Sequence, residues 1–386
     1  MNEPVAQPSL ATPRFLDSGD PEAQRREIRD ILASANPFRL NWEAPWLDKV
    51  FQAYCQPHRY FHTLQHLLDV CRRIRRLGLP RRNAGELLLA ALFHDVFWLP
   101  QGTRNEAASV EVFDFLRPSM GRELPQEAVQ AVHQIILSSK GQKPVSDCAR
   151  RFHECDCHVL LHGSPVDLLA YEFQIFREFQ SLNMAEYRKG RGGFFERFSR
   201  RFPECRPNMR FLIEYLERRR PRVGIYAGSF NPFHIGHLSI LQKAELMFDK
   251  VIVAVGVNPE KNPGRRGAAG QEEAMGVREK LPFHEVVFFD NLMVDLLDQE
   301  SQFCDVTLVR GLRNGYDLDY EMSQQCFMQA MRPQTHSVYI PCDKSLEHIS
   351  SSALRGLQLF DCRGRDEMYF PHLYDYYGKS IQELFG

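Results

Sequence analysis

Two histidines three residues apart follow a short apolar run in the second half of the chain. The run Val223–Tyr226 leads into a turn sequence, G-S-F-N-P, and His234 and His237 come directly after it. This order indicates a buried strand, a tight turn and a helix that begins near the histidines. The first helical turn presents unpaired N–H groups to an anion, and both histidines share one face. The spacing predicts a phosphate site; a capped helix with two incidental histidines is the alternative.

The turn itself offers groups that can contact a phosphate. Gly228 lets the main chain approach a ligand closely, and Ser229 adds a hydroxyl donor. Phe230 is included in the predicted phosphate-binding set, although packing is the more ordinary role for this ring and for Tyr226.

Cationic and hydroxyl side chains follow the other apolar, β-branched runs of this half. Lys261 follows Val251–Val257, and Arg310 and Arg313 follow Val306–Val309. The carboxyl ends of parallel strands meet at one edge of an open α/β sheet, where ligands bind. We therefore expect these groups to surround the histidines, together with the serines that follow Val338–Ile340, namely Ser350, Ser351 and Ser352. Taken singly, Lys261 is an ordinary loop lysine and the serines are helix N-caps.

Four blocks of this half resemble a known family. G-S-F-N-P-F-H-I-G-H resembles the signature of the nucleotidylyltransferase superfamily, with its (H/T)-x-G-H motif. With N-P-E-K-N-P, V-R-G-L-R-N-G-Y-D-L-D-Y-E-M and I-S-S-S-A-L-R, the chain from Val223 to about Pro371 looks like phosphopantetheine adenylyltransferase. The resemblance implies transfer of AMP from ATP, with Mg²⁺, to a phosphorylated acceptor, 4′-phosphopantetheine first. G-S-F-N-P is also typical of nicotinamide mononucleotide adenylyltransferases, which leaves that acceptor as an alternative.

The resemblance also implies a role for each matched residue. His237 and Ser229 would hold the α-phosphate, with His237 stabilising the transition state and His234 beside it. Lys261 and Arg310 would bind the phosphates of acceptor and nucleotide. The remaining nucleotide contacts would come from Arg313, Glu321, Ser350, Ser351 and Ser352.

The departures from the family pattern fall mainly on the acceptor side. Ser229 stands where the family has Thr, and Asn231 where it has Asp. A helical segment after the lysine is replaced by the Gly-rich Gly264–Gly276, which predicts a mobile surface loop. Leu346 replaces an aromatic residue, and Met328 lies near the position of an expected Asn. The triphosphate residues therefore match better than the acceptor pocket.

The first half of the chain carries a second set of chemically capable residues. His62 and His66 are one helical turn apart, and His94-Asp95 ends the apolar run Leu87–Phe93. Together with the distant Asp156, these groups can surround one divalent metal and leave positions open for water or substrate. His66 fits a ligand better than His62, because apolar residues follow it at helical spacing. Buried polar groups of a helix bundle are the alternative.

These residues resemble the HD superfamily of metal-dependent phosphohydrolases. The matching blocks are Pro57–His66, Phe93–Asp95 and Asn105–Ser109, within about Trp46 to Phe198. The resemblance implies a transition metal (Mn, Fe, Ni or Zn) and phosphoester hydrolysis. A Thr-x-x-His of the subgroup stands here as Ser138-Ser139-Lys140-Gly141, so one histidine is missing. A non-catalytic metal-binding or sensor module is the alternative.

The elements that would position these residues divide the chain in two. We expect a disordered arm at residues 1–20 and an all-α HD-type domain at residues 21–220. We expect an α/β Rossmann-like domain with a parallel sheet at residues 221–386. The charged run Arg218–Arg222 marks the boundary. Helical spacing of apolar residues predicts helices at Glu22–Ala33, Trp46–Tyr54, Thr63–Leu77, Glu86–Phe97, Asn105–Leu116, Gln126–Leu137 and Pro165–Phe179.

The amino-acid composition limits the kinds of binding partner that we expect. The 386 residues carry a net charge of −1, which gives no global basic excess for nucleic acid. The ten scattered cysteines predict free thiols in a reducing cytosol. There is no signal-peptide pattern and no apolar run that approaches a membrane span. We expect a cytoplasmic enzyme of small-molecule substrates, a nucleotide and a phosphorylated acceptor, with a homo-oligomer as a possibility.

Overall fold

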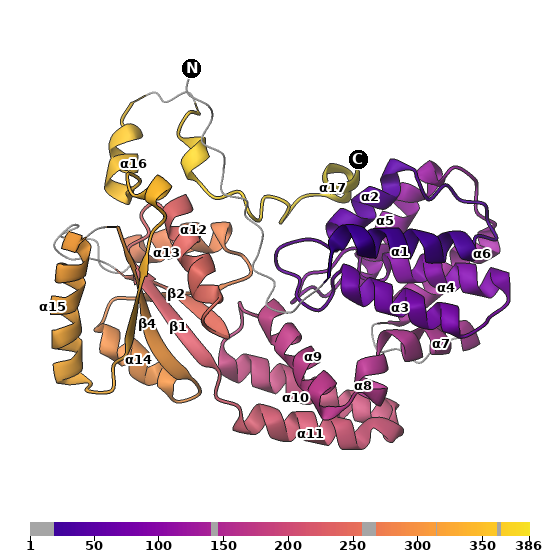
Figure 1. Ribbon diagram of the computed structural model, residues 1–386, viewed down its shortest axis with the longest axis horizontal. Helices are drawn as coiled ribbons and strands as arrows, with labels where there is room; N and C mark the ends of the chain where they lie inside the picture. Colours follow the sequence, from indigo (N-terminus) through magenta and orange to yellow (C-terminus); the bar gives the residue numbers. More distant parts are fainter. Residues whose placement is uncertain (1–18, 140–145, 257–267, 314, 361–363) are drawn as a thin grey trace. The chain divides into compact units, whose positions relative to one another are not determined.

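Five parallel strands form one sheet in the second half of the protein (Figure 1). This computed structural model describes residues 19–139, 146–256, 268–313, 315–360 and 364–386. The strand order is β3-β2-β1-β4-β5, and every pairing is parallel. The predicted parallel α/β sheet is confirmed, with strands β1 (Arg222–Gly228), β2 (Lys250–Gly256), β3 (Glu285–Phe289), β4 (Asp305–Leu312) and β5 (Ser337–Pro341).

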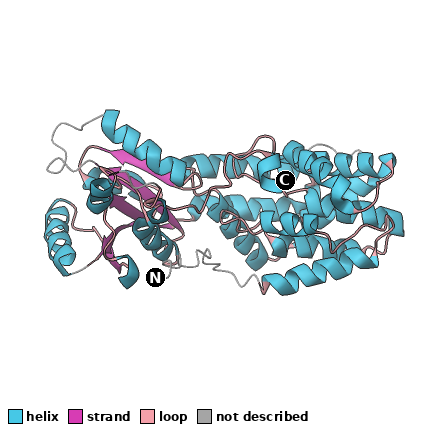
Figure 2. Ribbon diagram, turned by 90° about the horizontal axis from the view of Figure 1, so that it is seen from above, coloured by secondary structure: helices cyan, strands magenta, loops and turns pink. Residues whose placement is uncertain are grey.

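Helices cover both faces of this sheet (Figure 1, Figure 2). Two of them, α12 (Ile235–Glu245) and α13 (Ala268–Lys280), lie on one side, and α14 (Met293–Ser301) and α15 (Gly315–Met331) lie on the other (Figure 1). The central β1 is flanked by β2 and β4, so the direction of strand addition reverses between β1 and β4. In open α/β sheets, ligands bind at such a reversal, beyond the carboxyl ends of the strands.

The close approach of neighbouring elements at the sheet requires glycine at one position of β1. A Cβ on Gly224 would lie 2.7 Å from the Phe248 ring and 3.0 Å from a methyl of Val309. Those contacts are closer than side chains tolerate, so β1 packs where only a hydrogen fits.

The prediction of a loop over Gly264–Gly276 is wrong from Ala268 onward, where helix α13 begins. Residues 257–267 lie outside the described residues. Ala274, Val277 and Leu281 are buried and recur at helical spacing, so burial of one face outweighs the helix-weakening glycines. Two glycines within about a dozen residues made the helical spacing of these apolar residues hard to recognise in the sequence.

The first half is helical, as predicted (Figure 2), and its helices between Pro21 and Asp156 enclose an apolar core. Helix α1 begins after Asp20, whose carboxylate accepts the main-chain N–H of Glu22; the rest of the predicted arm, residues 1–18, lies outside the described residues. The helices are α1 (Pro21–Ser34), α2 (Pro45–Ala53), α3 (Leu64–Arg76), α4 (Arg81–Phe93), α5 (Asn105–Leu116), α6 (Gln126–Ser138), α7 (Asp147–Asp156), α8 (His158–His162), α9 (Pro165–Glu178), α10 (Met184–Arg201) and α11 (Arg206–Arg218).

The chain forms two compact units whose limits differ from a single boundary at residue 220. The sheet unit includes Gln180–Lys189 and Arg218–Tyr377, and Gly378–Gly386 packs with the helical unit. This tail contains α17 (Ile381–Phe385), and Lys49 Nζ donates to the main-chain oxygens of Phe385 and Gly386 at 2.8 and 2.5 Å. The tail is thus an element of the helical fold.

Among the described residues, no helix has the length and apolar character needed to cross a membrane. The cysteines in the same ranges are all free thiols.

Candidate functional site

A cluster of aromatic side chains packs against the turn that follows β1. Phe230 has a positive φ of 45° and is only 3% exposed. Its ring lies edge-on to His237 with centroids 5.0 Å apart, and it also contacts Tyr226 and Phe233. A Cβ on Gly228 would lie 3.0 Å from the Phe230 ring, closer than most Cβ contacts, so a side chain there would press on this ring. Phe230 therefore packs against His237 as a buried ring.

The two histidines at the start of α12 bind main-chain N–H groups through their Nδ1 atoms. His234 Nδ1 accepts from the N–H of Gly236 at 3.2 Å, and His237 Nδ1 accepts from the N–H of His234 at 3.3 Å. The rings stack with centroids 3.7 Å apart. A neutral imidazole whose Nδ1 is an acceptor carries its proton on Nε2. Both rings therefore keep an Nε2–H donor for a ligand.

Burial keeps these imidazoles neutral. Burial first, and then the charge of Arg313, lowers the pKa of His234 to about 4. Burial, His234 and Arg313 hold the pKa of His237 well below its usual value. Neutral N–H donors and a nearby guanidinium suit a site that receives a phosphate.

The arginine predicted at the end of β4 is already paired. Arg310 donates from Nε and Nη2 to both carboxylate oxygens of Glu321, at 2.6 and 2.7 Å. Its Nη1 donates to the main-chain oxygen of Ala227 at 2.8 Å, next to the turn. These bonds use three of the five guanidinium N–H groups. Arg310 thus ties β4 to the end of β1, with Glu321 as its partner.

The serine block reaches the same turn. Ser351 Oγ donates to the main-chain oxygen of Pro232 at 3.1 Å, and Ser350 Oγ caps helix α16 (Ser351–Leu357) through the N–H of Ala353. Arg355, which sequence reasoning did not single out, donates from Nη1 to the main-chain oxygen of Asn231 and from Nη2 to Ser352 Oγ. The start of α16 therefore lies against the turn that carries the histidines.

Asn231 and Arg313 each pair with an acidic residue. Asn231 Nδ2 donates to Glu273 of α13. The prediction of a loop over Gly264–Gly276 did not anticipate this contact. Arg313 Nε and Nη2 donate to Asp317 at 3.0 Å, while its charge still acts on both histidines. Lys261 lies outside the described residues.

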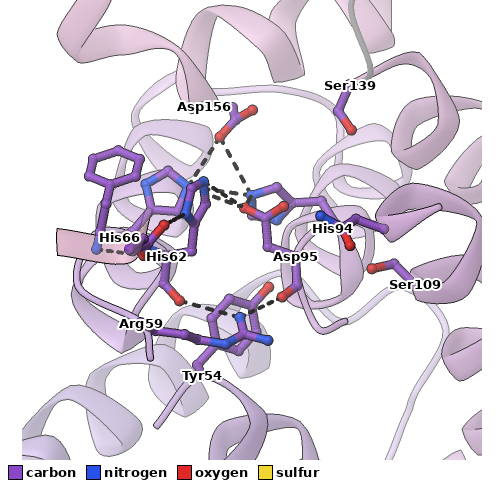
Figure 3. Close-up of polar contacts among 12 residues, drawn as sticks. Tyr54, Arg59, His62, His66, His94, Asp95, Ser109, Ser139 and Asp156 are labelled. Atoms are coloured by element: carbon purple, nitrogen blue, oxygen red, sulfur yellow. Dashed lines mark hydrogen bonds and ion pairs between the residues drawn. The ribbon is translucent and has the colours of Figure 1, made fainter. Parts of the chain in front are cut away.

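The predicted metal ligands of the helical unit point toward one another (Figure 3). His66 Nε2 is 3.1 Å from Asp156 Oδ1 and 3.4 Å from His94 Nε2. His94 Nε2 is also 3.4 Å from the same Asp156 oxygen and 2.9 Å from Asp95 Oδ2. Ligand atoms of His66, His94 and Asp156 all lie within 4.8 Å of one another. Imidazole and carboxylate donors at these separations fit one divalent transition metal.

A main-chain contact sets the orientation of His94. Its Nδ1 donates to the main-chain oxygen of Ala91 at 2.8 Å, which turns Nε2 toward the cluster. Such an outer contact is typical of metal-binding histidines. Burial would lower the pKa of His94, but Asp95 and Asp156 raise it well above its usual value. Burial would likewise raise the pKa of Asp95, but His94 and His62 lower it to about 2.

Two residues remote in sequence from His94 hold the main chain that carries Asp95. Arg59 donates to the main-chain oxygens of Asp95 at 2.6 Å and Val96 at 3.0 Å (Figure 3). Tyr54 Oη donates to the main-chain oxygens of Ala91 and Leu92. Arg59 belongs to the block Pro57–His66 and Tyr54 precedes it, and the contacts of both with the main chain around Asp95 follow only from the fold.

His62 lies at the edge of this cluster. Its Nε2 is 3.9 Å from Asp95 Oδ2, and its Nδ1 is 2.6 Å from Glu178 Oε2. Burial would lower the pKa of His62, but Glu178 and Asp95 raise it. Glu178, at the end of α9, was not foreseen from the sequence.

The position of the missing histidine, Gly141, lies outside the described residues, but the two serines that begin this block are described. Ser139 Oγ donates to the main-chain oxygen of Ile136, and Ser138 Oγ pairs with His153 Nε2 at 3.2 Å. Ser109, the last residue of the third block, accepts from the N–H of Phe97. These serines therefore support neighbouring main chain and a buried histidine.

Comparisons with known proteins bear on the sheet unit. A family model described as cytidylyltransferase-like matches residues 225–357. The phosphopantetheine adenylyltransferase of Nitrobacter winogradskyi is 36% identical over 155 residues, which cover 40% of this chain and 93% of that protein. The corresponding protein of Brucella anthropi is 34% identical over 138 residues, covering 34% of this chain and 82% of that protein. Through its C-terminal domain, the chain belongs to the cytidylyltransferase-like family.

A solved structure was also found. It is described as a nicotinate-nucleotide adenylyltransferase from Vibrio parahaemolyticus, with a TM-score of 0.29 and 15% identity over 42% of this chain and 94% of that chain.

The C-terminal domain is therefore a nucleotidyltransferase domain with phosphopantetheine adenylyltransferase relatives. Its matched segment, 225–357, includes the β1–α12 turn, the Arg310–Glu321 pair and the serine block. The family model does not extend to the helical unit, for which the HD resemblance stays a prediction.

The histidine pair yields a prediction on protonation. ¹⁵N NMR of histidine-labelled protein should show His234 and His237 as neutral Nε2–H tautomers between about pH 5 and 8, because both pKa values lie below the usual value of about 6.5. Below pH 6.5 the unfolded chain takes up these protons first, so the two rings favour unfolding as the pH falls toward 4.

Arg313→Ala should raise both pKa values, since its charge lowers them. The ¹⁵N signals of His133, whose ring pairs with Asp114 in the helical unit, are the control and should be the same in the variant and the wild-type protein. A proton on Nδ1 of either ring at neutral pH would contradict the assigned hydrogen bonds.

Proposed function

We propose that the C-terminal domain transfers AMP from ATP, accompanied by Mg²⁺, to the phosphate of 4′-phosphopantetheine. An oxygen of the acceptor phosphate attacks the α-phosphorus in line. The bond from the α-phosphorus to the bridging oxygen breaks, and pyrophosphate leaves with the electron pair. The products are dephospho-CoA and pyrophosphate. Nicotinamide mononucleotide is the alternative acceptor.

The observation that carries this proposal is the pair of imidazoles at the start of α12. Their Nδ1 atoms are occupied by main-chain N–H groups, which leaves two neutral Nε2–H donors at a helix N-terminus. Phosphoryl transfer needs little covalent help and depends on positioning and on donors aimed at developing charge. Ser351 and Arg355 hold the serine helix against the same turn. The relatives named above support phosphopantetheine as the acceptor.

His237→Ala should lower pyrophosphate release from ATP and 4′-phosphopantetheine by at least about 100-fold, since loss of one transition-state donor commonly has that effect. A coupled pyrophosphate assay with the purified full chain measures this.

His94→Ala, in the helical unit, is the matched control and should retain the wild-type rate. Pyrophosphate release that survives His237→Ala unchanged would reject the assignment.

We further propose that the helical unit binds one divalent transition metal (Mn, Fe, Ni or Zn) and hydrolyses a phosphoester. His66, His94, Asp95 and Asp156 would hold the ion, because their donor atoms converge and the His94 Nδ1–H is already used by Ala91. Such an ion lowers the pKa of water and polarises a phosphoryl oxygen. Arg59 and Tyr54 keep the main chain around Asp95 in place. A non-catalytic metal-binding or sensor module is the alternative.

Elemental analysis of the purified chain should find about one transition metal per chain, and Asp156→Asn should lose it, because Asp156 approaches both histidines. Adenylyl transfer should be unchanged in this variant.

A panel of phosphoesters, assayed with and without Asp95→Ala, separates the two roles of the helical unit. Hydrolysis that Asp95→Ala abolishes supports the hydrolase. Bound metal without hydrolysis of any ester would favour the sensor, and absence of metal from the wild-type chain would reject both.

A further inference from the structure

The last residue of helix α10, Arg201, carries a guanidinium group with no hydrogen-bond or ion-pair partner in the part of the chain that the structure describes. Its Nε and Nη2 atoms are both buried. The guanidinium lies over the Phe202 ring, 5.0 Å from the ring centroid. Most buried polar side-chain atoms in proteins have a hydrogen-bond partner, so two unpaired atoms on one side chain need an explanation.

The charge of Arg201 is unfavourable where it lies. Burial lowers the pKa of Arg201, and only Cys157 acts in the opposite direction among the described residues. A guanidinium stays protonated in proteins, so loss of a proton does not relieve the cost of this burial. A charge removed from water without a counter-ion destabilises a fold. A ligand of opposite charge would remove that cost.

The two unpaired atoms belong to the same edge of the guanidinium. The N–H bonds of Nε and Nη2 on this edge are parallel, and together they match two oxygens of an oxyanion. Arg310 uses the same edge in the sheet unit, where Nε and Nη2 bind both carboxylate oxygens of Glu321. The edge of Arg201 binds no described residue, and its charge excludes a metal cation as the ligand.

The chain segment after Arg201 packs against the segment that follows the proposed metal ligand Asp156. Asn208, near the start of α11, donates from Nδ2 to the main-chain oxygen of Leu160 in α8 at 3.0 Å (Figure 1). Helix α8 begins two residues after Asp156. The end of α10 is therefore held near the end of α7, where this ligand lies.

Two side chains connect the guanidinium with the metal cluster. Burial first, and then the charge of Arg201, lowers the pKa of His153 to about 4. Burial and Asp156 raise the pKa of Cys157, and Arg201 opposes them. Donor atoms of His153, Asp156 and Cys157 lie within 4.8 Å of one another. Arg201 thus neighbours side chains that lie directly beside a proposed ligand.

The charge balance of the proposed metal site calls for such a group. Two carboxylates, Asp95 and Asp156, already offset a divalent ion, so a phosphoryl dianion needs positive charge from another residue. Arg59 is committed to three main-chain oxygens. Arg201 has no commitment of this kind among the described residues.

We propose that Arg201 binds two phosphoryl oxygens of the helical unit's substrate through Nε and Nη2. The inference rests on the proposed phosphoester site of this unit, to which it adds the residue that holds the negative charge of the substrate. Arg201 touches the substrate, does not bind the metal and exchanges no proton.

The test uses inorganic phosphate as the probe, titrated by calorimetry into the full-length, metal-loaded protein. Arg201→Met keeps an unbranched side chain and removes the charge and both donors. It should bind phosphate at least about tenfold more weakly, as expected for loss of charge-assisted hydrogen bonds, and retain the wild-type metal content. Arg200→Met is the matched control, because the exposed Arg200 lies next in sequence and already pairs with Glu196; it should change neither quantity.

Thermal unfolding without phosphate separates ligand binding from a structural role. Arg201→Met should unfold at the wild-type Tm or above it, because the variant no longer buries an unpaired charge. Addition of phosphate should raise the Tm of the wild-type chain more than that of the variant. A clear fall in the Tm of Arg201→Met without phosphate would show a structural role and overturn the inference.

The remaining outcomes are also decisive. Unchanged phosphate affinity in Arg201→Met with full metal content would overturn the inference and leave the proposed metal site in place. Acetate that binds as tightly as phosphate, with the same dependence on Arg201, would assign a carboxylate ligand and overturn it too. A wild-type chain without metal would overturn the proposed metal site, and this inference with it.

Discussion

Two hydrogen bonds from the main chain to imidazole nitrogens fix the orientation and the tautomers of the two histidines in the nucleotidyltransferase domain. The N–H groups of Gly236 and His234 occupy the Nδ1 atoms of His234 and His237. This arrangement leaves each proton on Nε2 and uses N–H groups that a helix start would otherwise leave unpaired. A Cβ on Gly236 would lie 3.0 Å from His234 Cε1, so a side chain there would have to displace the His234 ring by a few tenths of an ångström. Burial completes the effect by keeping both rings neutral.

The order of the strands places Arg310, Ser351 and Arg355 around the turn that carries these histidines. Because β1 lies between β2 and β4, the ends of β1 and β4 are neighbours at the point where strand order reverses. Arg310 bridges them through Ala227, and Ser351 and Arg355 fasten α16 to the main chain of the turn. The positioning contacts are therefore largely main-chain contacts, which tolerate changes of side chain elsewhere. The helical unit uses the same device, with Arg59 and Glu178 holding the main chain around Asp95 and His62.

Short-range sequence patterns predicted the features that depend on residues close together in the chain or on a motif. The strand–turn–helix at His234, the alternation of strands and helices, and the convergence of His66, His94 and Asp156 followed from spacing and motif. Helix α13 was missed because glycines hid a buried face at Ala274 and Val277. Glu178 lies 116 residues from His62, and no local pattern links the two. For the same reason, the sequence did not indicate that Gly378–Gly386 packs with the helical unit.

We propose that the α-phosphate of ATP binds at the turn between β1 and α12. A crystal structure of the full chain with Mg²⁺ and α,β-methylene-ATP tests it directly. We expect an α-phosphate oxygen within about 2.7–3.2 Å of His237 Nε2, with the outer phosphates toward Arg313 and the serines of α16. A nucleotide bound with its phosphates away from both histidines would contradict it.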